Sequence, residues 1–210
     1  MTLNEVTPET FFINLLKRID RFDHFIAQTR NLGIFSLGCV GTDGSTIPNP
    51  TNLRNGEYAL LLSYQKIIQY ARNQDYPAIT VFEDDALFDP DFNSRFAAEY
   101  PEIPDDWDLV FLGENSSSLG AGWIPPDNIS DNIRRIYSSF GAHAIMIKNH
   151  MYDHILEGIN RFDKPLDVMY CDLQQRFKVY GFRRPLVKQA SFTSDIIGFN
   201  AMYLEQGIFD

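Results

Sequence analysis

The chain has 210 residues, of which 44% are hydrophobic and 22% are charged, and this composition excludes an intrinsically disordered protein. The length is sufficient for one α/β domain with its own core, and we expect a single domain over residues 1–210. The net charge of −10 argues against a nucleic-acid partner and against an anionic membrane surface.

The expected location follows from what the sequence lacks. Its longest apolar run is too short for a transmembrane segment, and its polar, acidic N-terminus is unlike a secretory signal. Cys39 and Cys171 show no metal-binding or redox spacing, and two isolated cysteines suit a reducing compartment. We therefore expect a cytoplasmic protein, or a catalytic domain of a larger one, without a transmembrane segment.

Strands and helices are predicted to alternate in the first half of the chain. The patterns indicate a strand at 10–15, a helix at 17–33, a strand at 34–41, a loop at 42–56 and a helix at 56–74. The apolar, β-branched segment 78–84 predicts a strand in the centre of a parallel sheet, and a short helix follows at 89–100.

The second half predicts paired strands as well as helices. The expected elements are a strand at 107–113, a loop at 114–132, strands at 133–139 and 142–148, helices at 149–159 and 165–180, and a last strand at 182–190. The order predicts an α/β domain with a mixed, mainly parallel sheet flanked by helices. Because ligands bind at the carboxyl ends of such strands, the ends of 10–15, 78–84 and 107–113 should face one crevice.

A cluster of acids follows the third predicted strand. Residues 83–108 contain ten acids and one base, and Glu83, Asp84 and Asp85 come first. Alternation along an extended chain points Glu83 and Asp85 to one side and Asp84 to the other. Two such carboxylates suit Mn²⁺ or Mg²⁺, which takes its other ligands from water and phosphate. The competing interpretation is a solvated turn before a helix N-terminus.

Several motifs, taken in their order along the chain, resemble glycosyltransferase family 25, the lipopolysaccharide-type galactosyltransferases and their collagen-modifying relatives. They are FFINLLKRIDRF, NGEYALLLSY, ITVFEDDALF, WDLVFLG, SFGAHAIMIKNHMYDHIL, KPLDVMYCDL and RPLVKQASFTSDI. The resemblance spans roughly the whole chain. It implies a GT-A fold, a nucleotide-sugar donor that is often UDP-linked, a glycan or other hydroxyl acceptor, inversion at the anomeric carbon and a divalent cation, usually Mn²⁺.

The resemblance also implies roles for individual residues. Glu83 and Asp85 would hold the metal, and Asp167 would be the catalytic base, with Asp172 in reserve. The donor would contact Asn14, Arg18, Arg21, Glu57, Glu83, Asp84, Gln189 and Ser194. Lys17 would contact the nucleotide phosphates together with Arg21, and the small-residue loop 114–122 would close over the donor. The structural alternatives are a favourable charge in a first helical turn for Asp167, solvated positions for Asp172 and Lys17, and plain surface for the loop.

One departure from the family leaves alternatives open. Tyr64 stands where the family usually has histidine, which favours a non-catalytic sugar- or nucleotide-binding member of the same fold. A metal-dependent phosphoesterase would use the same acids. The sequence offers no second acid or histidine cluster at metal-ligand spacing, which disfavours this last class.

Overall fold

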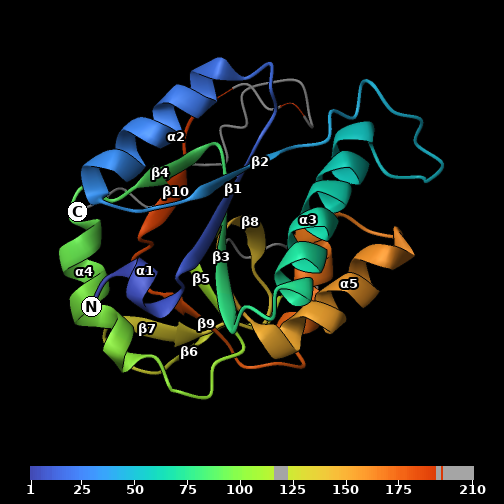
Figure 1. Ribbon diagram of the computed structural model, residues 1–210. Helices are drawn as coiled ribbons and strands as arrows, with labels where there is room; N and C mark the ends of the chain where they lie inside the picture. Colours follow the sequence, from blue (N-terminus) through green and yellow to red (C-terminus); the bar gives the residue numbers. More distant parts are fainter. Residues whose placement is uncertain (116–122, 193–194, 196–210) are drawn as a thin grey trace.

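The computed structural model describes residues 1–115, 123–192 and 195, and in these ranges it forms a sheet with helices on both faces (Figure 1). The helices are α1 (Leu3–Val6), α2 (Ile19–Leu32), α3 (Asn55–Asn73), α4 (Phe92–Glu99), α5 (Tyr152–Arg161) and α6 (Leu166–Gln174). The strands are β1 (Glu9–Asn14), β2 (Leu37–Val40), β3 (Ala78–Glu83), β4 (Ala86–Phe88), β5 (Leu109–Asn115), β6 (Asp127–Asn128), β7 (Ile133–Arg135), β8 (Phe140–Lys148), β9 (Val179–Phe182) and β10 (Val187–Gln189).

The large sheet is mixed and mainly parallel, which confirms the predicted architecture. Among the described residues its strand order is β2-β1-β3-β8-β5-β9-β7-β6. The pairings make β1, β2, β3, β5, β6 and β9 run in one direction, whereas β7 and β8 run in the other. A separate two-stranded ribbon pairs β4 with β10.

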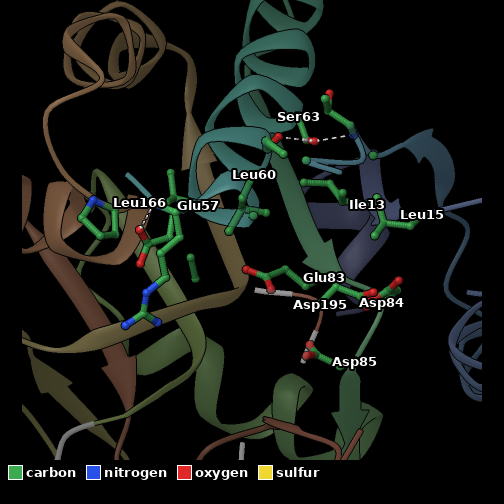
Figure 2. Close-up of a pocket in the computed structure, with 18 of the residues that line it drawn as sticks. Ile13, Leu15, Glu57, Leu60, Ser63, Glu83, Asp84, Asp85, Leu166 and Asp195 are labelled. Atoms are coloured by element: carbon green, nitrogen blue, oxygen red, sulfur yellow. Dashed lines mark hydrogen bonds between the residues drawn. The ribbon is translucent and has the colours of Figure 1, made fainter. Parts of the chain in front are cut away.

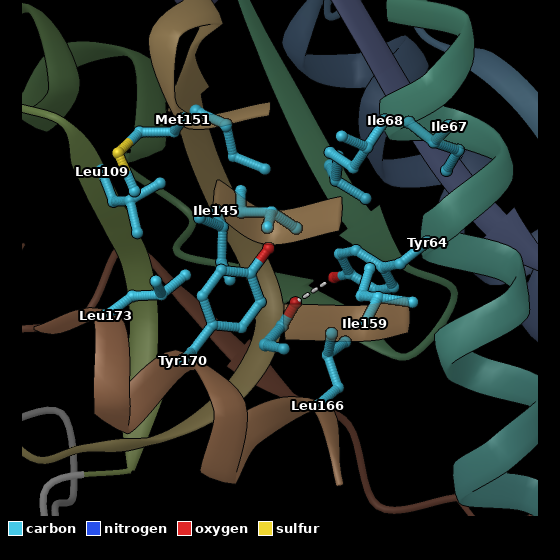
Figure 3. Packing of buried hydrophobic residues seen from close by; sticks show 14 of the residues in the cluster. Tyr64, Ile67, Ile68, Leu109, Ile145, Met151, Ile159, Leu166, Tyr170 and Leu173 are labelled. Atoms are coloured by element: carbon cyan, nitrogen blue, oxygen red, sulfur yellow. Dashed lines mark hydrogen bonds between the residues drawn. The ribbon is translucent and has the colours of Figure 1, made fainter. Parts of the chain in front are cut away.

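Alternation along the central strands divides the hydrophobic core into two layers. Phe11 and Ile13 of β1 face α3, α5 and α6, whereas Phe12 between them faces α2. The first layer is closed by helical side chains that interlock over the sheet, among them Tyr64 of α3, Ile159 of α5 and Tyr170 of α6 (Figure 3). The sheet is therefore covered on both faces, and its strand ends provide a rigid edge for a site.

The C-terminal third differs from the prediction. The helix expected over 165–180 ends at Gln174, and the segment Val179–Phe182 forms the buried strand β9 between β5 and β7. β-Branched and aromatic residues favour a strand there. The apolar positions that suggested a continuing helix belong to the sheet core.

Two further boundaries are corrected. The strand expected at 182–190 is divided, because Phe182 ends β9 and only Val187–Gln189 forms β10. Its partner β4 lies in the segment read as a turn, and the helix expected from residue 89 begins at Phe92. In the predicted loop 114–132, Glu114 and Asn115 extend β5, and residues 116–122 lie outside the described ranges.

The three predicted strand ends meet at one edge of the sheet. β1 and β3 are parallel neighbours, with Ile13 opposite Glu83 at their carboxyl ends. β5 runs in the same direction on the far side of β8 and ends at Asn115. Leu15, Glu83 and Asn115 all line one cavity at this edge, as the sequence predicted.

In the part of the chain that the structure describes, no helix combines the length and the hydropathy that a membrane span requires.

Candidate functional site

A cavity of about 720 Å³ opens at the carboxyl ends of the parallel strands (Figure 2). Its walls come from β1, from the turn after β3, from the starts of α3 and α6, and from the segment after β10. The charged lining residues are Lys17, Arg21, Asp43, Arg54, Glu57, Glu83, Asp84, Asp85, Asp167 and Asp195. The formal charge of this set is −4, from seven acids and three bases, so the cavity is electronegative.

The acids after β3 gather around Arg21 of α2. The strand ends at Glu83, and Asp84 and Asp85 form the turn to β4, so the turn begins earlier than the sequence indicated. Figure 2 shows Glu83 and Asp84 pointing to opposite sides. Nη1 of Arg21 lies 2.8 Å from Oδ1 of Asp84 and 3.5 Å from Oδ2 of Asp85. One guanidinium thus contacts two of the three carboxylates of this turn, and negative charge remains in excess.

Burial and the neighbouring negative charges raise the pKa values of Glu83 and Asp85, the first and third acids of this cluster. Burial raises the pKa of Asp85 to about 6, although the Arg21 guanidinium acts in the opposite direction. Burial, together with repulsion from Asp85 and Asp84, raises the pKa of Glu83 well above its ordinary value. Oδ1 of Asp85 is buried and has no hydrogen-bond partner in the described ranges. Such a group is suited to accept a cation, a bound ligand or an ordered water molecule.

The carboxylate oxygens of Glu83 and Asp85 are therefore suitable ligands for a divalent ion. Carboxylate oxygen is the donor that Mg²⁺ and Mn²⁺ prefer, and one or two carboxylates suffice when phosphate and water complete the shell. The described residues contain no group of three or more His, Cys, Asp or Glu side chains at metal-binding separation. A metal here would accordingly depend on oxygen atoms from a bound ligand.

Asp167 lies on another wall of the cavity, in the first turn of α6. Its Oδ1 accepts a hydrogen bond of 2.8 Å from the backbone N–H of Val168. Burial is the main cause that raises the pKa of Asp167, and the carboxylate of Glu57 adds to it. A partly buried carboxylate of raised basicity that faces a cavity suits a general base.

Asp172, the reserve candidate, does not line the cavity. Its Oδ2 pairs with Nζ of Lys164 at 2.7 Å, and its side chain is 45% exposed. Asp167 and Asp172 are five residues apart on α6, which places them on different faces of the helix.

The predicted donor residues divide into three groups. Arg21, Glu57, Glu83, Asp84 and Gln189 line the cavity. Asn14 and Arg18 are not lining residues but contact neighbours of the cavity: Nδ2 of Asn14 donates to Oδ2 of Asp84 at 2.8 Å, and Arg18 pairs with Asp20 at 2.8 Å. Ser194 lies outside the described residues, as do positions 116–122 of the loop considered as a cover.

Four charged residues of the wall, Lys17, Asp43, Arg54 and Asp195, were missed or discounted by the sequence analysis. Lys17, expected to be solvated, lines the cavity with its Nζ 2.7 Å from Oδ2 of Asp43. Asp43 comes from the predicted loop, and Asp195 comes from the segment after β10. The polar loop TDGS directly after β2 was the one available signal for Asp43, because a loop at the carboxyl end of a strand borders the crevice.

Tyr64 does not belong to the cavity wall. It is fully buried in α3, and its hydroxyl donates to the carbonyl of Ala142 at 2.6 Å (Figure 3). We expect Tyr64→Phe to lower the free energy of unfolding by about 1–2 kcal/mol, because a buried hydrogen bond is lost. Urea denaturation measures this change. Loss of nucleotide binding without loss of stability would instead show that position 64 acts in the site.

The burial of His143 predicts that the folded protein loses stability at acidic pH. It is buried, its Nε2 lies 3.3 Å from the carbonyl of Val187, and burial lowers its pKa to about 4. The unfolded chain takes up this proton below about pH 6.5, whereas the folded protein resists it, so stability falls as the pH decreases from 6.5 to 4.

Protonation of His143 in the unfolded chain should lower the free energy of unfolding by about 3 kcal/mol at pH 4, from 1.4 kcal/mol per pKa unit. We expect His143→Gln to lose less stability than the wild type across this window in urea titrations at several pH values. Identical slopes for the two proteins would contradict the assignment.

No protein-family model matches the chain, and no curated protein matches it. The family 25 resemblance is therefore not confirmed by these comparisons. Solved structures do show similarity. A crystal structure of a protein from STIV is 14% identical with a TM-score of 0.45, over 89% of this chain and 86% of that one.

Two glycosyltransferase structures are also similar. One, involved in glycosylation of the major capsid of PBCV-1, is 10% identical with a TM-score of 0.44, over 72% of this chain and 64% of that one. The other, a Drosophila β-1,4-galactosyltransferase 7 variant in complex with manganese, UDP-Gal and xylobiose, is 8% identical with a TM-score of 0.41, over 83% and 64%. This chain thus spans less than two thirds of the length of either, and such identities assign it no activity.

Proposed function

We propose that the chain is a metal-dependent glycosyltransferase with a GT-A-type site, which transfers a hexose from a nucleotide-diphosphate sugar, of the UDP type, to a hydroxyl acceptor such as a glycan. The observation that carries the proposal is the buried Oδ1 of Asp85, which has no hydrogen-bond partner among the described residues, beside Glu83 in the electronegative cavity. A site that concentrates carboxylates at this cost to their ionisation is suited to bind a cation. The order of family 25 motifs in the sequence supports the same class.

The wall residues suggest a division of roles. Glu83 and Asp85 would hold the divalent ion, which when bound supplies positive charge that stabilises the departing nucleoside diphosphate. Arg21 fixes the acid turn from α2 and keeps Asp84 and Asp85 in position. Lys17 and Arg21 add positive charge at the other side of the turn, where phosphate oxygens would lie.

Asp167 would accept the proton of the acceptor hydroxyl. It lines the same cavity as the acid turn but comes from α6, so a donor and an acceptor could be bound in this cavity between the two elements. A general base opposite the leaving diphosphate corresponds to direct displacement with inversion, the outcome that the family resemblance also implies.

A thermal-shift screen of nucleotide sugars with and without Mn²⁺ tests the proposal. We expect a UDP-sugar together with Mn²⁺ to raise Tm by several degrees, since a ligand at 100 times its Kd stabilises by about 2.7 kcal/mol. Positive combinations are then incubated with hydroxyl acceptors, and release of UDP is measured. No shift with any nucleotide sugar would refute the proposal.

Binding without turnover would instead identify the non-catalytic alternative. The main sequence argument for that alternative was the histidine replaced by Tyr64. Tyr64 lies in the core, so its identity removes no side chain from the cavity wall.

A further inference from the structure

Three cations next to the cavity converge on one carboxylate, that of Asp195. Nη1 of Arg18 contacts its Oδ2 directly, Nζ of Lys17 lies 3.8 Å from its Oδ1, and Nη2 of Arg21 lies 3.9 Å from its Oδ2. Asp195 lines the cavity and is 27% exposed, so the converging charges lie at a place that a ligand can reach.

Each of these cations also has a carboxylate of its own. Lys17 pairs with Asp43 at 2.7 Å, Arg18 with Asp20 at 2.8 Å, and Arg21 with Asp84 at 2.8 Å. Asp43 lies in the loop after β2, Asp20 in α2 and Asp84 in the acid turn, and these three carboxylates hold the cations in place. Asp195 is thus an additional anion that the three share, and its removal would take away a carboxylate that competes with a ligand anion for the same cations.

Residues 190–192 are fixed beside the same helix. The ring of Phe192 lies 5.8 Å from Cζ of Arg18 and 5.4 Å from Cζ of Arg21, and the ring of His24 meets its edge at 5.2 Å. The N–H of Ala190 donates to the carbonyl of Asp85 at 2.7 Å. These contacts hold the segment against α2 and the acid turn, next to the three cations.

We propose that Asp195 takes the place of a phosphate group in the ligand-free protein, and that the diphosphate of the donor displaces it from Lys17, Arg18 and Arg21. The inference rests on the proposed function in taking the ligand to be a nucleoside diphosphate. A diphosphate carries more charge than a carboxylate and offers more acceptor oxygens to arginine, so it competes well for the same donors. Asp195 thereby keeps the cations assembled and lowers the affinity of the empty site.

Calorimetric titration with inorganic pyrophosphate, without metal, tests this directly. Asp195→Asn should bind pyrophosphate about fivefold more tightly than the wild type, because an ion-pair partner that competes with the ligand is removed. Asp195→Glu, which keeps the charge, should resemble the wild type. Asp105→Asn is the control for net charge, because Asp105 is exposed and lies outside the cavity.

Arg18→Gln should weaken pyrophosphate binding in the wild-type and Asp195→Asn backgrounds alike. Unchanged or weaker pyrophosphate binding by a folded Asp195→Asn variant would overturn the inference, because removal of a competing carboxylate should increase the affinity for pyrophosphate. Far-ultraviolet circular dichroism and Tm establish that the variant is folded.

The same titration with a UDP-sugar and Mn²⁺ separates the two proposals. Tighter pyrophosphate binding by Asp195→Asn without any binding of UDP-sugars would support the anion site and refute the glycosyltransferase. Sugar transfer by the wild type, with no gain in pyrophosphate affinity in Asp195→Asn, would support the glycosyltransferase and refute the anion site.

Discussion

Replacing Asp167 by asparagine is expected to lower the rate of sugar transfer by about 10²–10⁴-fold, while the Kd for the donor changes by less than about threefold. The carboxylate faces the cavity, and burial raises its pKa, so the change removes the proton acceptor while keeping the shape of the wall. Rates of UDP release in the presence of acceptor, together with donor titrations, measure the two quantities separately.

Asp172→Asn is the matched control for Asp167. It makes the same change of atoms on the same helix, but Asp172 pairs with Lys164 outside the cavity. We expect this variant to retain activity within about twofold, as for most surface substitutions. A loss of transfer in Asp172→Asn that equals the loss in Asp167→Asn would show that the base has been assigned to the wrong residue.

Asp85→Asn should have opposite effects on binding and on stability. The Mn²⁺-dependent rise in Tm with a UDP-sugar should disappear, because one of the two proposed metal carboxylates is lost. The metal-free variant should be more stable than the wild type at pH 8, by roughly 1–3 kcal/mol, because a buried charge that is costly to ionise is replaced by a neutral amide.

The sign of this stability change follows from the raised pKa of Asp85. Its ionised form is disfavoured in the folded protein, so the cost is fully present above about pH 6 and disappears as the carboxyl becomes protonated. The advantage of the variant should therefore shrink at lower pH. Asp105→Asn controls for net charge, and a metal-free Asp85→Asn less stable than the wild type would show that Asp85 has a structural role.

The sequence predicted the edge of the sheet where the cavity lies. The run Ala78–Glu83 is largely apolar and then acidic, so both the strand and its acidic end can be recognised locally. The same holds for β1 and β5, whose ends carry Lys17 and Asn115 into the cavity. A periodic pattern and its end are local properties, and these were predicted correctly.

Pairings between distant segments could not be predicted in the same way. Arg21 and Asp84 are 63 positions apart, and Arg18 and Asp195 are 177 apart. Nothing local marks either pair, because only the folded arrangement of α2, the acid turn and the segment after β10 brings them together. The strand β9 was missed for a related reason, since its apolar residues gain their strand conformation from β5 and β7 on either side.

Location of the ion is the most direct test of the central claim, that the acid turn after β3 binds a dication which in turn binds a nucleotide sugar. Crystals grown with Mn²⁺ and a UDP-sugar would give an anomalous difference peak for manganese. We predict this peak between the carboxylates of Glu83 and Asp85, in contact with the diphosphate. Manganese and nucleotide bound together at another place, with both carboxylates free of metal, would contradict the account.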